Sequence, residues 1–544
     1  MNSSKSGAPL QHDHLLRYRD RGLWTGSTLG DAARALADKH PDEPVYLAGE
    51  NTFAVSRIVS EAEALAIAMR DLGVTTGTTV SFQLPNWYEA AVINVACALL
   101  GAVVTPIVPI YRDAEVGVML RDSGSRLHFT ASTIRHFDYV AMLARLHGDL
   151  PNLHTIVVRG NGDRSYAALL ESGRGRTPSF ARVNPDSVKL LLYTSGTTGG
   201  PKAVLHSHET LARCLRETAR HWQLGRGEHV LMPSPVTHVT GYGMGLEVPF
   251  IVGTRTVLME AWDAGKALEL ITHHQIVATL SATPFLAELT DAAQRAGTRL
   301  PTLRIFACGG APVPPELVYR ANATFAQPCA FRVYGASEVP MITVGYPRAK
   351  DASLPAATDG EVIDYEVRIV DDHGKELPFG TAGEILARGP SMFLGYSDMA
   401  ATQAALTDDG FFRTGDVGVL TADGSLTVTG RKKDLIIRGG ENISAKEIED
   451  ALHQHPGILE AAVVSMPHTR LGEGICAYIV ARQPGLEWRL DEVGAHVLSK
   501  GLARQKCPEH IEIVPALPKT ASGKVRKDLL RADIRSKLDS LRSE

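Results

Sequence analysis

The chain has 544 residues, a length that suggests about three or four domains or subdomains. Lysine and arginine number 56 against 60 aspartates and glutamates, so the formal net charge is −4. That balance excludes a nucleic-acid or membrane-surface protein that depends on a strongly basic face.

Six cysteines are scattered along the chain without a Cys-x-x-Cys pair: Cys97, Cys214, Cys308, Cys329, Cys476 and Cys507. The pattern predicts neither a disulfide framework nor a zinc site, and it favours a reducing cytoplasm. The N-terminal segment lacks the apolar core of a signal peptide.

One apolar stretch, Ala90–Ile110, is long enough to span a membrane. Asn94, Gly101 and Pro106 interrupt it, however, and divide it into a helix of about three turns and a short strand. We therefore predict a core helix followed by a buried parallel strand, in a soluble cytoplasmic protein.

Between about residue 77 and residue 345, short apolar runs alternate with longer helical patterns. We expect strands at Val80–Leu84, Thr155–Val158, Val230–Met232, Thr256–Met259, Val277–Ser281 and Leu303–Cys308. We expect helices at His208–Gln223, Gly265–His274 and Phe285–Ala296. This alternation predicts layered α/β subdomains with largely parallel sheets.

The pattern changes near Gly360, where short strands predict a small antiparallel β subdomain. Its strands are expected at Glu366–Val370, Gly383–Arg388 and Ser425–Gly430, with a turn at Asp371–Gly374. After it we expect helices at Ser444–His455 and Leu490–Gly501, strands at Ala461–Ser465, Ile475–Ala481 and Ile511–Val514, and a final basic helix.

The predicted fold class is therefore α/β. A large N-terminal domain (residues 1–430) contains the layered α/β subdomains, with the β-rich subdomain at about 360–430. A small α+β domain (residues 431–544) follows, and the charged segment at 431–434 is suited to link the two.

A loop rich in Gly, Ser and Thr, closed by Lys202, directly follows the apolar strand that ends near Tyr193. Glycines let backbone N–H groups turn toward a ligand, hydroxyls add donors, and the lysine adds a point charge, so the loop predicts a phosphate-binding site. It is not a Walker A loop, because Pro201 precedes the lysine and Ala203 follows it. A flexible surface loop is the alternative.

The segment Tyr193–Lys202 resembles the signature loop of the adenylate-forming enzymes, which include acyl-CoA synthetases, peptide-synthetase adenylation domains and firefly luciferases. Four other motifs of that family follow in the same order: Tyr334–Glu338, Phe412–Asp416, Gly430–Asp434 and Pro518–Lys524. Five motifs in order over most of the chain identify it as a member of this family.

The resemblance implies that a carboxylate attacks the α-phosphate of ATP to give acyl-AMP and pyrophosphate, and that a thiol then displaces AMP. Because the first step joins two anions, it needs positive charge and Mg²⁺ at the phosphates. The phosphate contacts would come from Thr194, Ser195, Gly196, Thr197, Thr198, Gly199 and Lys202. Glu338 would hold Mg²⁺, which prefers carboxylate oxygen; taken alone, it would be a solvated surface acid.

For the rest of the nucleotide, the resemblance implies that Asp416 accepts hydrogen bonds from the ribose, assisted by Arg431. Tyr334 would offer its aromatic face to adenine, with a core tyrosine as the alternative. The other ATP or AMP contacts are expected at Gly309, Gly310, Ala311, Gly335 and Ser337. Two positions depart from the family pattern: Ala203 stands where glycine is usual, and Ser337 replaces the commoner threonine.

By the same resemblance, Lys524 is the catalytic lysine of adenylation, and Lys433 is the hinge about which a mobile C-terminal domain rotates. One pose would bring Lys524 to the site. The other would bring the coenzyme A (CoA) segment, which consists of Arg438, Gly439, Gly440 and Glu441. Catalytic roles are also implied for Glu338, Lys202 and His238.

The segment Pro235–Gly243 lies where the family lines its acyl pocket, and it has no acidic residue before Glu247. An α-amino acid, which needs a carboxylate for its ammonium group, is therefore a poor candidate substrate. His238 is expected to gate the pocket, with a structural histidine as the alternative. The other expected pocket residues are Tyr242, Ala282, Thr283, Ala307, Val333, Pro340 and Met341, all neutral, which predicts an apolar pocket.

His206 and His208 could face one way on a strand as a metal pair, but no third ligand lies nearby in sequence, so solvated or hydrogen-bonded histidines are expected. The segments Pro85–Trp87, Pro109–Arg112 and Arg438–Ser444 most resemble the branch that activates short- to medium-chain fatty acids and cyclohexanecarboxylate.

The sequence therefore predicts an ATP-dependent acyl-CoA synthetase that acts on medium-chain fatty or alicyclic acids, with ATP, Mg²⁺ and CoA. The alternatives are an acyl-AMP ligase that loads a carrier protein, a CoA ligase for aromatic or sterol-derived acids, and an inactive nucleotide-binding relative. A homodimer is a further hypothesis.

Overall fold

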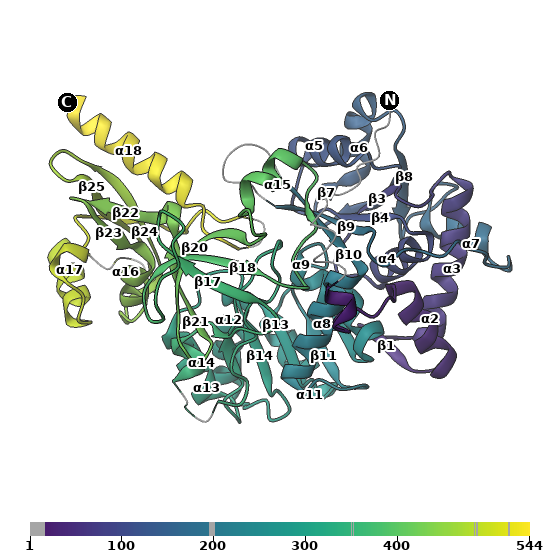
Figure 1. Cartoon of the computed structure of the whole chain (residues 1–544), viewed down its shortest axis with the longest axis horizontal. Helices are drawn as coiled ribbons and strands as arrows, with labels where there is room; N and C mark the ends of the chain where they lie inside the picture. Colours follow the sequence, from purple (N-terminus) through teal and green to yellow (C-terminus); the bar gives the residue numbers. More distant parts are fainter. Residues whose placement is uncertain are drawn as a thin grey trace.

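The computed structural model describes residues 17–194, 202–349, 351, 353–483, 485, 488–520 and 523–543. Its larger sheets are two of seven strands and two of five strands. The C-terminal elements gather on one side of the molecule, away from the helices α2 (Leu29–Lys39), α3 (Val55–Asp71) and α7 (Tyr166–Gly173) (Figure 1). The predicted α/β class, with a large N-terminal and a small C-terminal domain, is confirmed.

One seven-stranded sheet has the order β19-β10-β9-β4-β3-β5-β8. Its strands are β3 (Thr79–Gln83), β4 (Val103–Pro106), β5 (Leu127–Ala131), β8 (His154–Val158), β9 (Val188–Thr194), β10 (Lys202–Ser207) and β19 (Gly395–Tyr396). The pairs from β9 to β8 are parallel, whereas β10 pairs antiparallel with β9 and with β19. The strands β9 and β10, which flank the predicted phosphate loop in the sequence, are therefore antiparallel neighbours.

The apolar stretch Ala90–Ile110 forms α4 (Tyr88–Leu100) and then β4, and every residue from Glu89 to Leu100 is buried. The prediction of a core helix and a buried parallel strand is confirmed. In the described part of the chain, no helix combines the length and the apolar character that crossing a bilayer requires.

The second seven-stranded sheet has the order β15-β14-β13-β11-β12-β1-β2. Its strands are β1 (Pro44–Ala48), β2 (Asn51–Ala54), β11 (His229–Met232), β12 (Arg255–Leu258), β13 (Ala278–Ser281), β14 (Ile305–Cys308) and β15 (Ala330–Arg332). All of its pairs except β1–β2 are parallel. One cluster of buried side chains extends continuously from this sheet to the first, which fixes the two layers against each other.

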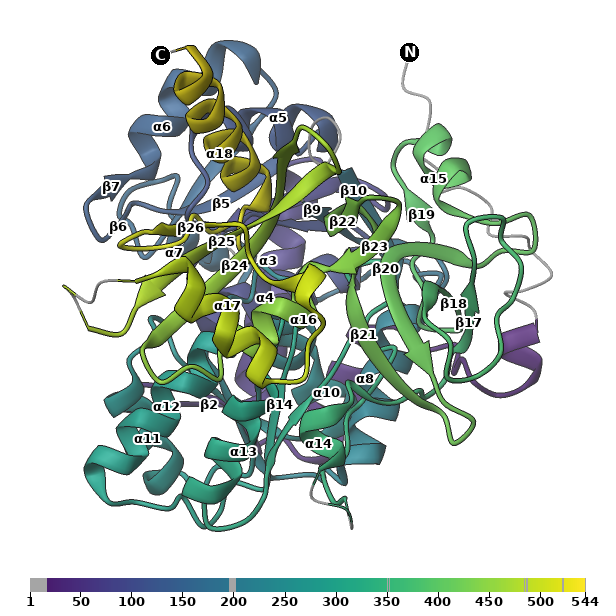
Figure 2. The same cartoon turned by 90° about the vertical axis from the view of Figure 1, so that its left-hand side faces the viewer.

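The antiparallel sheet has the order β16-β21-β20-β18-β17, with β16 (Gly360–Glu361), β17 (Glu366–Val370), β18 (Gly383–Arg388), β20 (Phe412–Leu420) and β21 (Ser425–Arg431). The C-terminal sheet contains β22 (Leu435–Arg438), β23 (Glu441–Ser444), β24 (Ile458–His468), β25 (Gly472–Ala481) and β26 (His510–Ile513). Figure 2 views this last sheet with α16, α17 and α18 around it.

The longer helices are α2 (Leu29–Lys39), α3 (Val55–Asp71), α5 (Asp113–Ser123), α6 (Tyr139–Leu146), α7 (Tyr166–Gly173), α8 (His208–Trp222), α11 (Ala264–His273), α12 (Thr283–Ala296), α13 (Pro315–Thr324), α16 (Ala445–Leu452), α17 (Leu490–Ser499) and α18 (Lys527–Ser543). Each strand and helix expected from the sequence has a counterpart within a few residues. A π-helix at Tyr242–Glu247 was not expected, and β24 is longer than predicted.

Candidate functional site

Asp416, on β20, is held by two neighbours. The Tyr334 hydroxyl donates a hydrogen bond to its Oδ2 at 2.7 Å, and Arg431 Nε lies 3.2 Å from its Oδ1. Burial, together with the negative charge of Asp416, raises the pKa of Tyr334, so this phenol stays a proton donor. The cluster presents a carboxylate with fixed orientation, which suits it to accept hydrogen bonds from sugar hydroxyls.

Glu338 is buried, and its Oε1 accepts a hydrogen bond of 2.7 Å from the Tyr396 hydroxyl. The Lys202 ammonium lies over the ring of Tyr396, with Nζ 5.2 Å from the ring centroid. Within the described residues, no ion pair involves Glu338 or Lys202, so both charges remain available to a ligand.

His206 fixes the segment that carries Glu338. It is fully buried, and its Nε2 donates to the Ser337 carbonyl oxygen at 2.7 Å, while its Nδ1 lies 3.1 Å from Thr210 Oγ1. Burial lowers the pKa of His206 to about 4, so the ring is neutral at physiological pH. The Leu29 N–H donates to His208 Nδ1 at 3.2 Å.

Hydrogen-bonded histidines at these two positions are thus confirmed. No group of three or more metal-ligating side chains is found in the described part of the chain.

Two glycines permit close backbone approach near Tyr334. A Cβ added at Gly309 would lie 2.5 Å from the Val333 carbonyl oxygen, and one added at Gly335 would lie 2.4 Å from the Met341 nitrogen. Met341 itself has a φ of 53°, in the left-handed region that side chains rarely adopt. The end of β14 and the Tyr334 segment can therefore pack tightly only with glycine at these positions.

Lys524 lies among residues of the N-terminal domain. Burial lowers its pKa, Arg431 lowers it further, and Asp416 and Glu338 raise it. Lys524 in turn acts on His238, whose pKa falls to about 4, chiefly because the surrounding protein atoms desolvate the ring. The structure thus brings Lys524 together with both carboxylates and the arginine that the sequence motifs singled out.

A short loop holds Lys524 in this place. Its backbone N–H donates to Thr520 Oγ1 at 3.1 Å, and the Thr520 N–H donates to its carbonyl oxygen at 2.7 Å. Gly523, with a φ of 82°, supplies the left-handed residue of the turn.

The segment around Lys433 is fastened to both domains. Lys432 pairs with Glu384 on β18 at 3.1 Å, and Arg531 on α18 pairs with Asp434. Burial, followed by the charge of Arg431, lowers the pKa of Lys433.

The predicted CoA residues form the turn between β22 and β23, where Gly439 and Gly440 both have positive φ. Arg438 pairs with Glu509 at 2.7 Å, and Glu441 accepts a hydrogen bond from Gln505. These contacts lie within the C-terminal domain, and no contact of these residues with the Lys524 cluster is found among the described residues.

The predicted acyl-pocket residues fall on several elements. Tyr242 is fully buried in the π-helix, and its hydroxyl donates to Asn94 Oδ1 at 2.6 Å. Thr283 donates to the Pro312 carbonyl oxygen at 2.9 Å. Ala307, Val333 and Pro340 are buried, whereas His238, Ala282, Thr283 and Met341 are partly exposed.

Glu247, the first acid after the pocket segment, is fully buried and pairs with Lys189 on β9. Asn94 donates to the same carboxylate at 3.2 Å. Because its charge is already neutralised, Glu247 is a poor partner for a substrate ammonium group.

Thr194 ends β9, and its hydroxyl donates weakly to the Lys202 carbonyl oxygen at 3.4 Å. The predicted phosphate contacts Ser195, Gly196, Thr197, Thr198 and Gly199 lie outside the described residues. Gly310 has a φ of 78°, and Ala311 follows it after β14.

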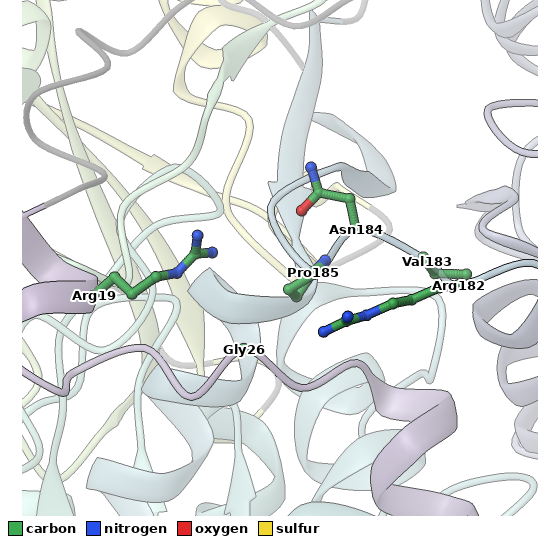
Figure 3. A pocket seen from close by; sticks show the side chains of 6 residues that line it. All are labelled: Arg19, Gly26, Arg182, Val183, Asn184 and Pro185. Atoms are coloured by element: carbon green, nitrogen blue, oxygen red, sulfur yellow. The ribbon is translucent and has the colours of Figure 1, made fainter.

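A separate cavity of about 470 Å³ lies between the N-terminal segment and the loop that precedes β9. Figure 3 shows its lining residues, Arg19, Gly26, Arg182, Val183, Asn184 and Pro185. Arg19 is paired with Asp186 at 2.6 Å. None of the six lining residues belongs to the cluster around Lys524.

Sequence reasoning missed Tyr396, Arg531 and the contact of His206 with Ser337. Tyr396 and Arg531 lie outside the five motifs. Tyr396 is 58 residues from its partner Glu338 in the sequence, and Arg531 is 97 residues from its partner Asp434. No local pattern could have revealed these pairs, because they depend on the folded arrangement.

The family model of the AMP-binding enzymes matches residues 33–397, and the model of the AMP-binding enzyme C-terminal domain matches residues 447–524. The chain therefore belongs to the AMP-binding enzymes, the adenylate-forming family that its motifs resemble.

The chain is 34% identical over 530 residues to the medium-chain fatty-acid–CoA ligase of Escherichia coli (strain K12), covering 96% of this chain and 93% of the relative. It is 31% identical over 531 residues to the 2,3-dihydroxybenzoate–AMP ligase of Bacillus subtilis (strain 168), covering 96% of each. The crystal structure of ATP-bound MatB from Rhodopseudomonas palustris matches with a TM-score of 0.83 and 26% identity, covering 93% of this chain and 99% of that one.

Proposed function

We propose that this protein is an acyl-CoA synthetase that converts a carboxylic acid, ATP and CoA into acyl-CoA, AMP and pyrophosphate through an acyl adenylate. The observation that carries the proposal is the position of Lys524, which shares one site with Glu338, Asp416 and Arg431. A lysine there can neutralise the substrate carboxylate and the α-phosphate as they approach each other.

In this proposal, Asp416 binds the ribose hydroxyls, and Arg431 and Tyr334 keep its carboxylate oriented. Tyr334 also offers its ring to adenine, and the backbone at Gly309, Gly310 and Ala311 approaches the base. Lys202 and the loop before it bind the β- and γ-phosphates. Gly335 allows the tight turn that precedes Ser337 and Glu338.

Glu338 is suited to hold Mg²⁺, because its carboxylate is buried and forms no ion pair within the described residues. When bound, the ion neutralises phosphate charge. The residues of the chain do the rest: Lys202 and Lys524 add positive charge where the anionic groups meet.

We further propose that the domains divide at residues 430 and 431, with the hinge at 431–434 and Lys433 as its pivot. Support comes from the change of sheet close to this point, between β21, which ends at Arg431, and β22, which begins at Leu435. Rotation there would withdraw Lys524 and bring Arg438, Gly439, Gly440 and Glu441 toward the acyl adenylate for CoA attack.

For the acid, we propose a medium-chain fatty or alicyclic substrate, with His238 as the gate of its pocket. The expected lining residues are neutral, Glu247 is paired with Lys189, and one relative is named a medium-chain fatty-acid–CoA ligase. An aromatic acid is the second candidate, because another relative is named a 2,3-dihydroxybenzoate–AMP ligase. A homodimer and a cytoplasmic location stay predictions.

The test is AMP release with Mg-ATP across a panel of acids, with and without CoA. The panel runs from acetate to palmitate and includes cyclohexanecarboxylate, benzoate, salicylate and several amino acids. We expect CoA-dependent turnover that is greatest with medium-chain or alicyclic acids. Acyl-AMP formation that ignores CoA would indicate a carrier-loading ligase, and a preference for benzoate or salicylate would indicate the aromatic branch.

A further inference from the structure

We propose that Tyr396 is a positioning residue of the phosphate site: it orients the Glu338 carboxylate for a divalent cation and keeps it apart from Lys202. This inference rests on the proposed function, because it concerns how the same site binds Mg-ATP. Tyr396 belongs to none of the motifs that identify the family in this sequence.

Tyr396 contacts both charged groups of the site at once. Its hydroxyl donates to Glu338 Oε1 at 2.7 Å, and the Lys202 Nζ lies 5.2 Å from its ring centroid. One aromatic side chain thus offers a donor to the anion and a π face to the cation.

The fold holds Tyr396 firmly in this place. It lies on β19, paired with Val204 of β10, the strand that begins at Lys202. Its backbone N–H donates to Thr402 Oγ1 at 2.9 Å, and its ring packs edge-on against Phe393 with centroids 5.1 Å apart. A backbone hydrogen bond, from the Phe393 N–H to the Glu338 carbonyl oxygen at 2.8 Å, joins the same segment to the backbone of Glu338.

A lysine and a glutamate that contact the same side chain in a partly buried site are expected to pair, because their attraction strengthens as water is removed. In such a pair the two charges would neutralise each other. The lysine would then be less able to bind phosphate, and the carboxylate less able to bind a cation. Within the described residues, neither Lys202 nor Glu338 forms an ion pair. Tyr396 gives the Glu338 carboxylate a hydrogen-bond donor and the Lys202 ammonium an aromatic face, and it adds no net charge. These two contacts explain how the lysine and the glutamate stay unpaired.

Two substitutions separate the hydroxyl from the ring. Tyr396→Phe removes only the hydrogen bond to Glu338, whereas Tyr396→Leu also removes the aromatic surface under Lys202. Tyr139→Phe is a matched control. Tyr139 is the buried first residue of helix α6, and the substitution deletes a hydroxyl that donates to the Pro109 carbonyl oxygen at 2.7 Å.

The measurement is calorimetric binding of ATP without acid or CoA, titrated over Mg²⁺ concentration, together with binding of AMP without Mg²⁺. For Tyr396→Phe we expect the Mg²⁺ concentration for half-maximal ATP binding to rise by about tenfold, the lower end of losses seen when a group orienting a metal ligand is removed. AMP affinity should not change. Tyr396→Leu should weaken ATP binding further, even at saturating Mg²⁺.

Unchanged Mg²⁺ dependence in Tyr396→Phe would overturn the inference, and so would equal losses of ATP and AMP affinity, which indicate general damage to the site. ATP binding by the wild-type protein that ignores Mg²⁺ would overturn it as well. Failure of the proposed function is a different result: the wild-type protein would then release no AMP with any acid of the panel.

Discussion

Asp416 and Arg431 face each other as direct partners across the antiparallel strands β20 and β21, with Nε and Oδ1 3.2 Å apart. Arg431 is also the last residue of β21, immediately before the 3₁₀ turn at Lys432–Asp434. The group proposed to bind ribose is therefore joined, through one ion pair, to the end of β21, beside the segment proposed as the hinge.

Replacing Asp416 should weaken nucleotide binding. In Asp416→Asn the amide keeps the shape but loses the charge that Arg431 and Tyr334 hold in place, so we expect the KM for ATP and the Kd for AMP to rise together. A loss of about tenfold or more corresponds to one charge-assisted hydrogen bond. The KM for the acid should change little.

The control for this substitution is Asp409→Asn, at an exposed carboxylate that pairs with Arg368 at 2.7 Å. It should leave nucleotide binding unchanged. Wild-type AMP affinity in Asp416→Asn would contradict the assigned role.

Removing the Lys524 ammonium should separate the two half-reactions. Lys524→Ala is expected to lower acid-dependent exchange of pyrophosphate into ATP by about a hundredfold or more, the scale of losing one preorganised electrostatic contact. Attack of CoA on supplied acyl-AMP should continue, because the proposed thioester pose does not use this lysine. The control is Lys519→Ala, at a lysine of the same loop that pairs with Glu460.

If Lys524→Ala slowed both half-reactions equally, the lysine would not be specific to adenylation.

The ion pair between Arg531 and Asp434 should favour the pose in which Lys524 reaches the site. Arg531 extends from α18 and binds the segment proposed as the hinge. In Arg531→Ala we expect adenylation to slow several-fold, by about 1 kcal/mol for a partly exposed pair, without slowing of the thioester step.

Exchanging the two charges, as Arg531→Asp with Asp434→Arg, should restore part of the loss. Arg526→Ala, which breaks the exposed pair with Asp528 at 2.6 Å, should have no effect on either step. No recovery in the exchanged variant would show that the pair itself does not hold the pose.

Acid should destabilise the fold through its buried neutral histidines. Burial lowers the pKa of His206 from 6.5 to about 4, and that of His128 to about 3. As the pH falls below 6.5, His206 becomes protonated in the unfolded chain, whereas in the folded chain it stays neutral until about pH 4. The contribution to folding stability is therefore complete above pH 6.5 and is lost as the pH falls from 6.5 to about 4.

For His206 the loss across this pH range is on the order of 3 kcal/mol. Urea unfolding near neutrality and near pH 4 measures it, and His206→Gln should flatten the difference. His136→Gln, at an exposed histidine, should not. An unchanged pH dependence in His206→Gln would contradict the explanation.

Much of the fold could be predicted because its signals are local. The parallel strands are short apolar runs, and α4 could be told from a membrane span by Gly101 and Pro106, which end the helix and divide the stretch. The turn expected at Asp371–Gly374 is also present, because the Gly374 N–H donates to the Asp371 carbonyl oxygen at 3.1 Å.

The π-helix at Tyr242–Glu247 was not predicted, and its last residue, Glu247, contacts Lys189 and Asn94 from distant elements, which no local pattern reveals. Tyr396 and the Arg531 pair were missed for the same reason. Thr-Gly-Asp, which in isolation would indicate a turn, lies inside β20 because β18 and β21 pair with it on both sides.

The central claim is that the chain forms an acyl adenylate, and the most direct test is acid-dependent exchange of labelled pyrophosphate into ATP by the wild-type protein without CoA. We predict exchange that requires both Mg²⁺ and an acid, with AMP as the nucleotide product once CoA is added. Exchange without acid, or ADP and phosphate as products, would contradict the claim.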